Sequence, residues 1–447
     1  MHVVNITWLS WVTVTIVGYY VLLLIVPAAR WLSWRHAKTA SFVRRPFMVL
    51  VIPAHNEEAV IGQTLATLNA LDYPERLVLV MDDGSTDATA AVANHWAWMS
   101  RRTRSGWMSV VSRGPDVAGQ GKGAVLNHAF ALVCWMVARR DPRLGGRGAD
   151  EIVIGVMDAD GQLETDALTK VAPYFSGRRN ARVGGVQIGV RIANATTNLL
   201  TLMQDIEFVG FSALVQDSRN SFGSVGLGGN GQFTRLSALQ QLRRDPWTAC
   251  LSEDLDLSLS LAEIGWKIRY CPATFVAQQG LPQLWPLLRQ RARWVQGHYQ
   301  CWRHVGSIWG SRELAWRAKL DITVYLTMIL FIIINFAGLV INVLSWAHVV
   351  VPVNTSLDAI TNPYLHNITE LILSAGPLAA FVVVYQIRSR NPLRWWELFA
   401  VAVLFTAFAS VVWVAGQIWA WCRIVTGRGS WAKTPRVRAE IAVEMAA

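Results

Sequence analysis

Acidic side chains recur in this sequence directly after short apolar runs, a position that suits the binding of a metal ion and a phosphate. Asp158 and Asp160 follow the run at residues 152–157, and Asp82 and Asp83 follow a second run. If these runs are buried strands, the acids project from the carboxyl edge of one sheet. Because successive side chains of an extended chain alternate in direction, those of Asp158 and Asp160 are expected to point the same way. We therefore expect Asp160, assisted by Asp158, to bind Mg²⁺ or Mn²⁺, which prefer hard oxygen ligands and phosphate.

Two further features on the same edge suit a nucleotide. A carboxylate at Asp82 or Asp83 can accept hydrogen bonds from a base or ribose, although an Asp-Gly turn with a helix cap explains the same residues. Lys122 lies in a glycine-rich segment, residues 119–123, that opens a predicted helix. Its ammonium and the nearby amides can hold an anion, but the spacing is not that of a GxxxxGK[ST] loop. A plain loop is the alternative.

Glu253 and Asp254 begin another predicted helix, where acids also complement the helix dipole. We predict that Asp254, with Glu253 beside it, is a general base that removes a proton from an acceptor hydroxyl. Such assistance accelerates a reaction by about 10²–10⁴-fold. Gly229 and Asn230 belong to a glycine-rich stretch that allows a bulky acceptor to approach the backbone, or that forms a simple turn.

One five-residue motif combines an amide, two guanidinium groups and an indole: Gln290, Arg291, Ala292, Arg293 and Trp294. Arginines bind diphosphate in a bidentate way, so we predict that Arg291 and Arg293 contact the donor. An indole face can stack on a pyranose ring. This places Trp294, with Gln290 beside it, on the acceptor side, whereas a basic amphipathic surface helix is the alternative.

The composition excludes an ordinary soluble protein. Hydrophobic residues make up 53% of the chain and charged residues 16%, against about 25% charged residues in typical soluble domains. Four blocks contain no Lys, Arg, Asp or Glu: residues 1–29, 322–357, 371–387 and 398–422. Since about 20 apolar residues cross a bilayer, each block is a candidate span. We predict that the first is an anchor and not a cleaved signal peptide.

Basic residues predict how these spans are oriented. Those between residues 30 and 45 place the middle of the chain in the cytoplasm, whereas residues 346–366 contain no Lys or Arg and are predicted to be external. Three later spans would leave the C-terminus outside, yet basic residues between 423 and 438 favour the inside, so the sequence leaves this open. We assign the net charge of +11 to contacts with anionic lipid and not to nucleic acid.

Apolar runs alternate with helical spacing from residue 46 onward, which predicts βα units in a doubly wound α/β sheet. The predicted strands are residues 47–52, 77–81, 109–111 and 152–157, and the predicted helices are 57–70, a segment running towards 98, and 123–137. The cysteines are scattered and support neither a disulfide framework nor a zinc site. The predicted divisions are a first span with a basic linker (1–45), a catalytic domain (46–280), amphipathic interfacial helices (281–318), C-terminal spans (319–424) and a basic tail (425–447).

In these motifs the chain resembles the membrane-embedded family-2 glycosyltransferases, which include cellulose, hyaluronan, chitin and poly-N-acetylglucosamine synthases. The resemblance covers residues 46–320, and residues 431–436 resemble a tail motif of some relatives. It implies a GT-A-like fold, inverting transfer from a UDP-sugar, and a metal at the Asp158–Asp160 motif. Residues 228–232 differ from the acceptor loop expected of a bacterial cellulose synthase. Matching residues that the resemblance assigns to the donor are Pro53, Asn56, Glu57, Asp82 and Asp83.

The resemblance implies a processive β-glycosyltransferase of the cell membrane, with its catalytic domain in the cytoplasm. It would polymerise a sugar from UDP-glucose or UDP-N-acetylglucosamine and export the growing polysaccharide through the lipid bilayer. The alternative is the addition of one sugar to a lipid, because ceramide glucosyltransferases share these motifs. A third hypothesis, a transporter or receptor that only binds a nucleotide-sugar, leaves Glu253, Asp254 and residues 290–294 without a role.

Overall fold

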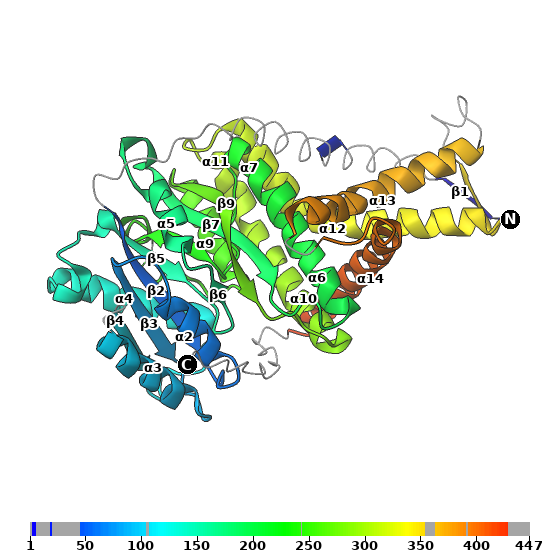
Figure 1. Ribbon diagram of the computed structural model, residues 1–447. Helices are drawn as coiled ribbons and strands as arrows, with labels where there is room; N and C mark the ends of the chain where they lie inside the picture. Colours follow the sequence, from blue (N-terminus) through cyan, green and yellow to red (C-terminus); the bar gives the residue numbers. More distant parts are fainter. Residues whose placement is uncertain are drawn as a thin grey trace.

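A mixed sheet of eight strands forms the centre of the molecule (Figure 1). The computed structural model describes residues 2–5, 18–19, 45–103, 107–242, 244–353, 363–389 and 392–427. The strand order is β4-β3-β2-β5-β8-β7-β9-β6. Their bounds are β2 (Phe47–Ala54), β3 (Arg76–Asp82), β4 (Trp107–Ser112), β5 (Ile152–Val156), β6 (Gln162–Leu163), β7 (Val183–Ile192), β8 (Gln232–Arg235) and β9 (Lys267–Gln278).

The four predicted strands are confirmed as β2, β3, β4 and β5, and they run parallel. The predicted doubly wound pattern does not extend to the other half, where β8 is antiparallel to both β5 and β7, so the sheet is mixed. Gln232, Thr234 and Arg235 of β8 are buried polar residues. Because the strand is short and lacks an apolar run, no periodicity marks it in the sequence.

Helices cover both faces of the sheet, as its parallel half requires. The alternation along β2 sends Met48, Leu50 and Ile52 into one core and Phe47, Val49 and Val51 into the other. The first core is completed by α2 (Ile61–Asn69), α3 (Thr89–Thr103) and α5 (Ala167–Val171), and the second by α4 (Lys122–Ala138), α8 (Leu236–Gln240) and α9 (Glu253–Glu263). Helix α2 begins four residues later than predicted, because the amides of Val60 and Ile61 close a turn on the Glu57 carbonyl.

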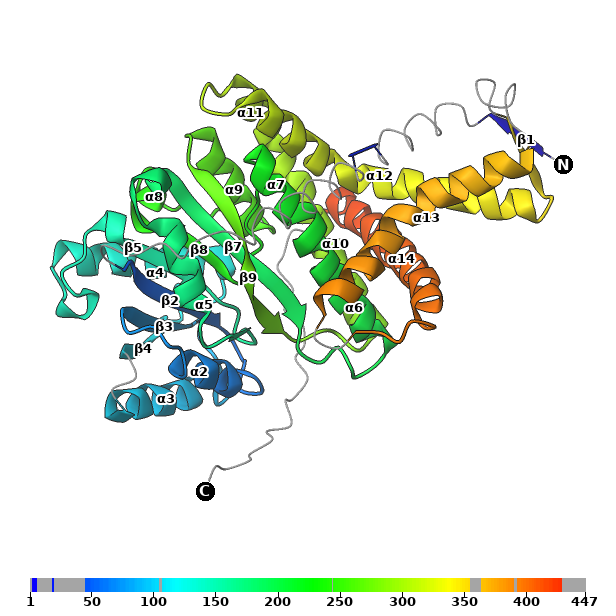
Figure 2. The ribbon, with the colours of Figure 1, turned by 45° about the horizontal axis from the view of Figure 1, so that its top comes forward.

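A second group of helices packs beside the sheet and extends away from it (Figures 1 and 2). Helix α6 packs on α13, and α10 packs on α14. The bounds are α6 (Leu199–Gly210), the π-helical turn η5 (Phe211–Gln216), α7 (Asp217–Phe222), α10 (Leu284–Gln300), η6 (Cys301–His304), α11 (Val305–Gly310), α12 (Trp316–Trp346), α13 (Pro363–Arg388) and α14 (Leu398–Val425).

Two of these helices, α12 and α14, are long and apolar enough to cross a membrane, with mean hydropathies of 2.5 and 2.4. Their insertion stays a prediction. Strand β1 (His2–Asn5) pairs in parallel with β10 (Val350–Val353). The distribution of basic residues predicts that both segments lie on the external side of the membrane, and in the structure they are adjacent. The rest of the predicted first span, apart from residues 18–19, and the tail beyond residue 427 lie outside the described residues.

A buried ion pair fastens α12 to α7. Arg219 of α7 donates from Nε to Asp321 Oδ2 at 2.8 Å, and its guanidinium carbon lies 4.0 Å from the centre of the Tyr325 ring. Ser224 donates to the same carboxylate. Since a buried charge requires a partner and hydrogen bonds, this contact determines how the apolar helix meets the sheet.

Candidate functional site

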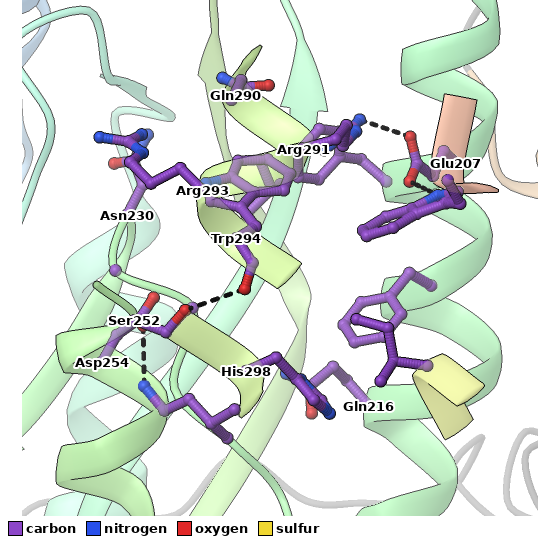
Figure 3. A pocket seen from close by; sticks show the side chains of 18 of the residues that line it. Glu207, Gln216, Asn230, Ser252, Asp254, Gln290, Arg291, Arg293, Trp294 and His298 are labelled. Atoms are coloured by element: carbon purple, nitrogen blue, oxygen red, sulfur yellow. Dashed lines mark hydrogen bonds and ion pairs between the residues drawn. The ribbon is translucent and has the colours of Figure 1, made fainter. Parts of the chain in front are cut away.

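A cavity of about 430 Å³ lies where the carboxyl edge of the sheet meets α6, α10 and the apolar helices (Figure 3). Most of the residues predicted from the sequence line it: Lys122, Asp158, Asp160, Gly229, Asn230, Glu253, Asp254, Gln290, Arg291, Arg293 and Trp294. Residues from five separate parts of the chain therefore meet in one place. Pro53, Asn56, Glu57, Asp82 and Asp83 lie along the same edge, outside the lining of this cavity.

The outer residues form a cross-linked platform. Asn56 has a left-handed backbone (φ 53°), and its Oδ1 accepts from the Thr86 amide at 2.7 Å. Asp83 pairs with Arg113, which follows β4, and accepts from the Gly119 amide at 3.2 Å. Arg113 was missed from the sequence because a single basic residue after a weak strand carries no motif. The Asp83 charge is thus balanced within the protein, which leaves Asp83 as a hydrogen-bond acceptor.

Lys122 lies at the centre of the acidic end of the cavity. Its Nζ is 2.6 Å from Asp158 Oδ1 and 3.7 Å from Glu253 Oε1. Burial acts to lower the pKa of Lys122, but the carboxylates of Asp158 and Glu253 outweigh it and raise that pKa. The ammonium predicted to hold a phosphate therefore stays charged and already binds a carboxylate.

The two acids of the Asp158–Asp160 motif have different partners. Asp158 turns to Lys122, whereas Asp160 is buried and its Oδ2 accepts from the Gln279 amide at 3.0 Å. Four carboxylates, those of Asp158, Asp160, Glu253 and Asp254, line the cavity together with the one ammonium of Lys122. This excess of negative charge and of hard oxygen atoms fits a divalent cation.

Asp254 lies at the start of α9 against the backbone of Gly229. Burial, helped by the negative charge of Glu253, raises the pKa of Asp254 to about 7. Gly229 has a φ of +76°, and a methyl group on it would lie 2.8 Å from Asp254 Oδ2. The close approach predicted at this glycine thus accommodates the Asp254 carboxylate.

Asn230 links two strands of the sheet. Its Oδ1 accepts from the Asp158 amide at 3.1 Å, and its Nδ2 donates to Gln278 Oε1 at 2.9 Å. The side chain predicted to bind an acceptor therefore holds Asp158 in place.

Arg291 differs most from its predicted role as a donor clamp. It is fully buried, and its Nη2 lies 2.6 Å from Glu207 Oε2 on α6. The indole of Trp413, on α14, donates to the other Glu207 oxygen at 2.8 Å. Glu207 neutralises the charge of Arg291, so Arg291 is not a free cation for the donor. Its guanidinium carbon instead lies 4.3 Å from the centre of the Trp294 ring and supports that ring. Sequence reasoning missed Glu207, although an acid inside the apolar run 199–215 is a visible signal.

Beyond Trp294 the cavity becomes apolar. It is bounded there by rings and aliphatic side chains of four helical segments, α6 with η5, α12, α13 and α14. The side chains are Phe208, Phe211, Tyr325, Met328, Ile329, Phe331, Ile332, Pro377, Leu378, Phe381, Phe405 and Ala409. One cavity thus joins an acidic end to an apolar end.

The family described as "Glycosyltransferase like family 2" matches residues 46–297, which is more than half of the chain and includes all the motifs above. The chain belongs to this family. It is therefore an enzyme that transfers a sugar, and its sheet has the GT-A-like arrangement.

The names of individual relatives of this glycosyltransferase indicate different products. The beta-monoglucosyldiacylglycerol synthase of Synechocystis sp. is 32% identical over 297 residues, covering 65% of this chain and 55% of the relative. The poly-beta-1,6-N-acetyl-D-glucosamine synthase of Staphylococcus epidermidis is 24% identical, covering 56% and 54% respectively. The chain spans about half the length of the curated relatives it matches.

A solved structure shares the overall fold. A mannosyltransferase from Pyrobaculum calidifontis, in complex with GDP-mannose and Mn²⁺, superposes with a TM-score of 0.53 at 15% identity, covering 92% of this chain and 99% of its own.

Gly229 and Gly223 provide a matched test of the site, because both have a φ of +76° but only Gly229 faces Asp254. A methyl group at Gly223 meets nothing within 4 Å. We expect both Gly→Ala variants to lose stability by about 1–2 kcal/mol. Gly229→Ala should also lower the rate of sugar transfer by roughly 10–10²-fold, because it displaces Asp254. Equal transfer rates in the two variants would contradict this geometry.

Proposed function

We propose that this glycosyltransferase transfers one glucose from UDP-glucose to the hydroxyl of a membrane lipid, with inversion at the anomeric carbon. The observation that carries the proposal is the apolar end of the cavity, which continues from the acids at the sheet edge. A lipid acceptor has a hydroxyl for the acidic end and hydrocarbon for the apolar end. Each buried methylene stabilises such a complex by about 0.8 kcal/mol.

The comparisons favour lipid transfer over the processive synthesis expected first. The glucosyl-lipid synthase matches at higher identity and over more of the chain than the polysaccharide synthase. A processive synthase remains the second candidate, because Trp294 offers an aromatic face that would hold any pyranose. The proposed location is the membrane, with α12 and α14 inserted and the catalytic domain in the cytoplasm.

Each group in the cavity has a proposed task. Asp254 takes the proton of the acceptor hydroxyl as the oxygen bonds to the anomeric carbon and the bond to UDP breaks. Asp160 and Asp158 would hold Mg²⁺ or Mn²⁺, which would supply positive charge to neutralise the departing diphosphate. Arg293 lies on the donor side, and Trp294 with Gln290 orients the acceptor. Arg291 is a positioning residue that acts through Trp294.

The proposed base predicts the pH dependence of transfer. Because the pKa of Asp254 is raised to about 7, its carboxyl is protonated below that pH, and kcat/KM should fall about tenfold per pH unit. Asp254→Asn should lower transfer by at least about 10²-fold above pH 7 and should lose this pH dependence. Asp166→Asn, on the exposed end of α5, is the control and should keep the wild-type profile. A wild-type rate in Asp254→Asn would remove this residue from the mechanism.

Removal of divalent metal should abolish transfer. We expect a chelator to stop UDP release and added Mg²⁺ or Mn²⁺ to restore it. Asp160→Asn should raise the metal concentration required, whereas Asp141→Asn, in the loop with Arg143, should not. Undiminished transfer in excess chelator would contradict a metal site at Asp158 and Asp160.

Product analysis separates the two candidate functions. Protein reconstituted with UDP-glucose and diacylglycerol should form a singly glucosylated lipid, whereas a ladder of longer products would favour the polymerase.

Ala409→Phe fills the apolar end of the cavity and should reduce lipid glucosylation while sparing UDP-glucose binding. Val403→Phe, on an exposed part of the same helix, is the control. Lipid transfer at the wild-type rate in Ala409→Phe would contradict the proposed acceptor site.

A further inference from the structure

Two cysteines that are distant in sequence meet close to the start of α9, the helix that begins with Glu253 and Asp254. Cys250 precedes α9 and Cys301 begins η6, directly after α10, and their sulfurs are 3.8 Å apart. Both side chains are buried, with 8% of Cys250 and none of Cys301 exposed. The scattered spacing in the sequence, which argued against a cysteine site, therefore conceals a close pair.

The surroundings of the pair favour thiol chemistry over metal binding. An Asp256 carboxylate oxygen lies within 4.8 Å of both sulfurs. However, Asp256 already accepts from Thr248 at 2.7 Å, pairs with Arg303 and contacts His304 Nε2 at 2.8 Å. Burial acts to lower the pKa of His304, but the hydrogen bonds of this histidine to Asp256 and Glu263 outweigh burial and raise its pKa to about 9. With two cations on this carboxylate, a third cation would be repelled.

We propose that Cys250 and Cys301 form a reversible disulfide that switches off sugar transfer. The thiolate is the reactive form of cysteine. Hydrogen bonding with Cys301 lowers the pKa of Cys250 in spite of burial. The cationic Arg303 lies close enough to act in the same direction.

The chemistry requires an oxidant, for which a low-molecular-weight disulfide such as oxidised glutathione suffices. The Cys250 thiolate attacks one sulfur of that disulfide, forming a mixed disulfide and releasing one small thiolate. Cys301 then loses its proton and attacks the Cys250 sulfur, releasing the second small thiol. The two cysteines are oxidised, the small disulfide is reduced to two thiols, and an excess of small thiol reverses the reaction.

The pair is coupled to the active site through a tight contact. A methyl group on Gly297 of α10 would lie 2.3 Å from Ser252 Oγ and 2.5 Å from its amide nitrogen, so helix and loop already touch. The Leu251 amide also donates to Gln300 Oε1 at 2.9 Å. The sulfurs must close from 3.8 Å to about 2.05 Å. Because helix and loop are already in contact, this closure should shift the residues that follow Cys250. These lead through Ser252 to Asp254 at the start of α9.

The test uses the full chain reconstituted in lipid and treated with oxidised glutathione. We expect trypsin to release peptides 245–267 and 294–303 joined by a disulfide, each containing one cysteine. Transfer should fall at least about tenfold and return with a small thiol. Cys250→Ser and Cys301→Ser should transfer normally and resist the oxidant, whereas Cys422→Ser, at an exposed cysteine, should respond like the wild type.

Three results would overturn the proposal. The linked peptide could fail to form, it could form without loss of transfer, or Cys301→Ser could lose activity with oxidant as the wild type does. About one equivalent of zinc bound to the wild type and lost in both serine variants would identify a metal site instead. The peptide measurement does not depend on the acceptor, so its outcome is separate from that of the lipid proposal.

Discussion

The concentration of like charge around Lys122 is the constraint on which the site depends. Carboxylates from the end of β5 and the start of α9 would repel one another in a partly buried cavity. The ammonium at the start of α4 balances two of them, at 2.6 Å from Asp158 and 3.7 Å from Glu253. This arrangement holds three elements together around Asp254. Burial and the negative charge of Glu253 raise the pKa of Asp254 in spite of the nearby ammonium.

A second cation organises the opposite wall of the cavity. Arg291 is buried against Glu207 and stacked on Trp294, so one guanidinium joins α6, α10 and, through Trp413, α14. Removing either charge would leave the other buried without a partner, which is strongly destabilising. The indole offered to a substrate is thus fixed by the helices that form the apolar end.

The two ends of the cavity impose different chemistry on a ligand. The acids and the ammonium suit a polar, charged ligand, whereas the rings beyond Trp294 suit hydrocarbon. The proposed reaction between a nucleotide-sugar and a lipid would need both environments in one cavity. The fold provides them by placing the edge of the sheet against apolar helices.

The βα half of the sheet, the acidic motifs and the apolar blocks follow from the sequence alone, because each leaves a local pattern of period, motif or composition. Eleven of the residues predicted from the sequence line the cavity in the structure. The antiparallel direction of β8, the contact of Asn230 with Asp158 and the pairing of Arg291 with Glu207 are visible only in the folded chain. It alone brought Cys250 to Cys301 and the apolar wall to the acids. These features join residues far apart in the chain, and a buried polar contact has no periodicity that a sequence could reveal.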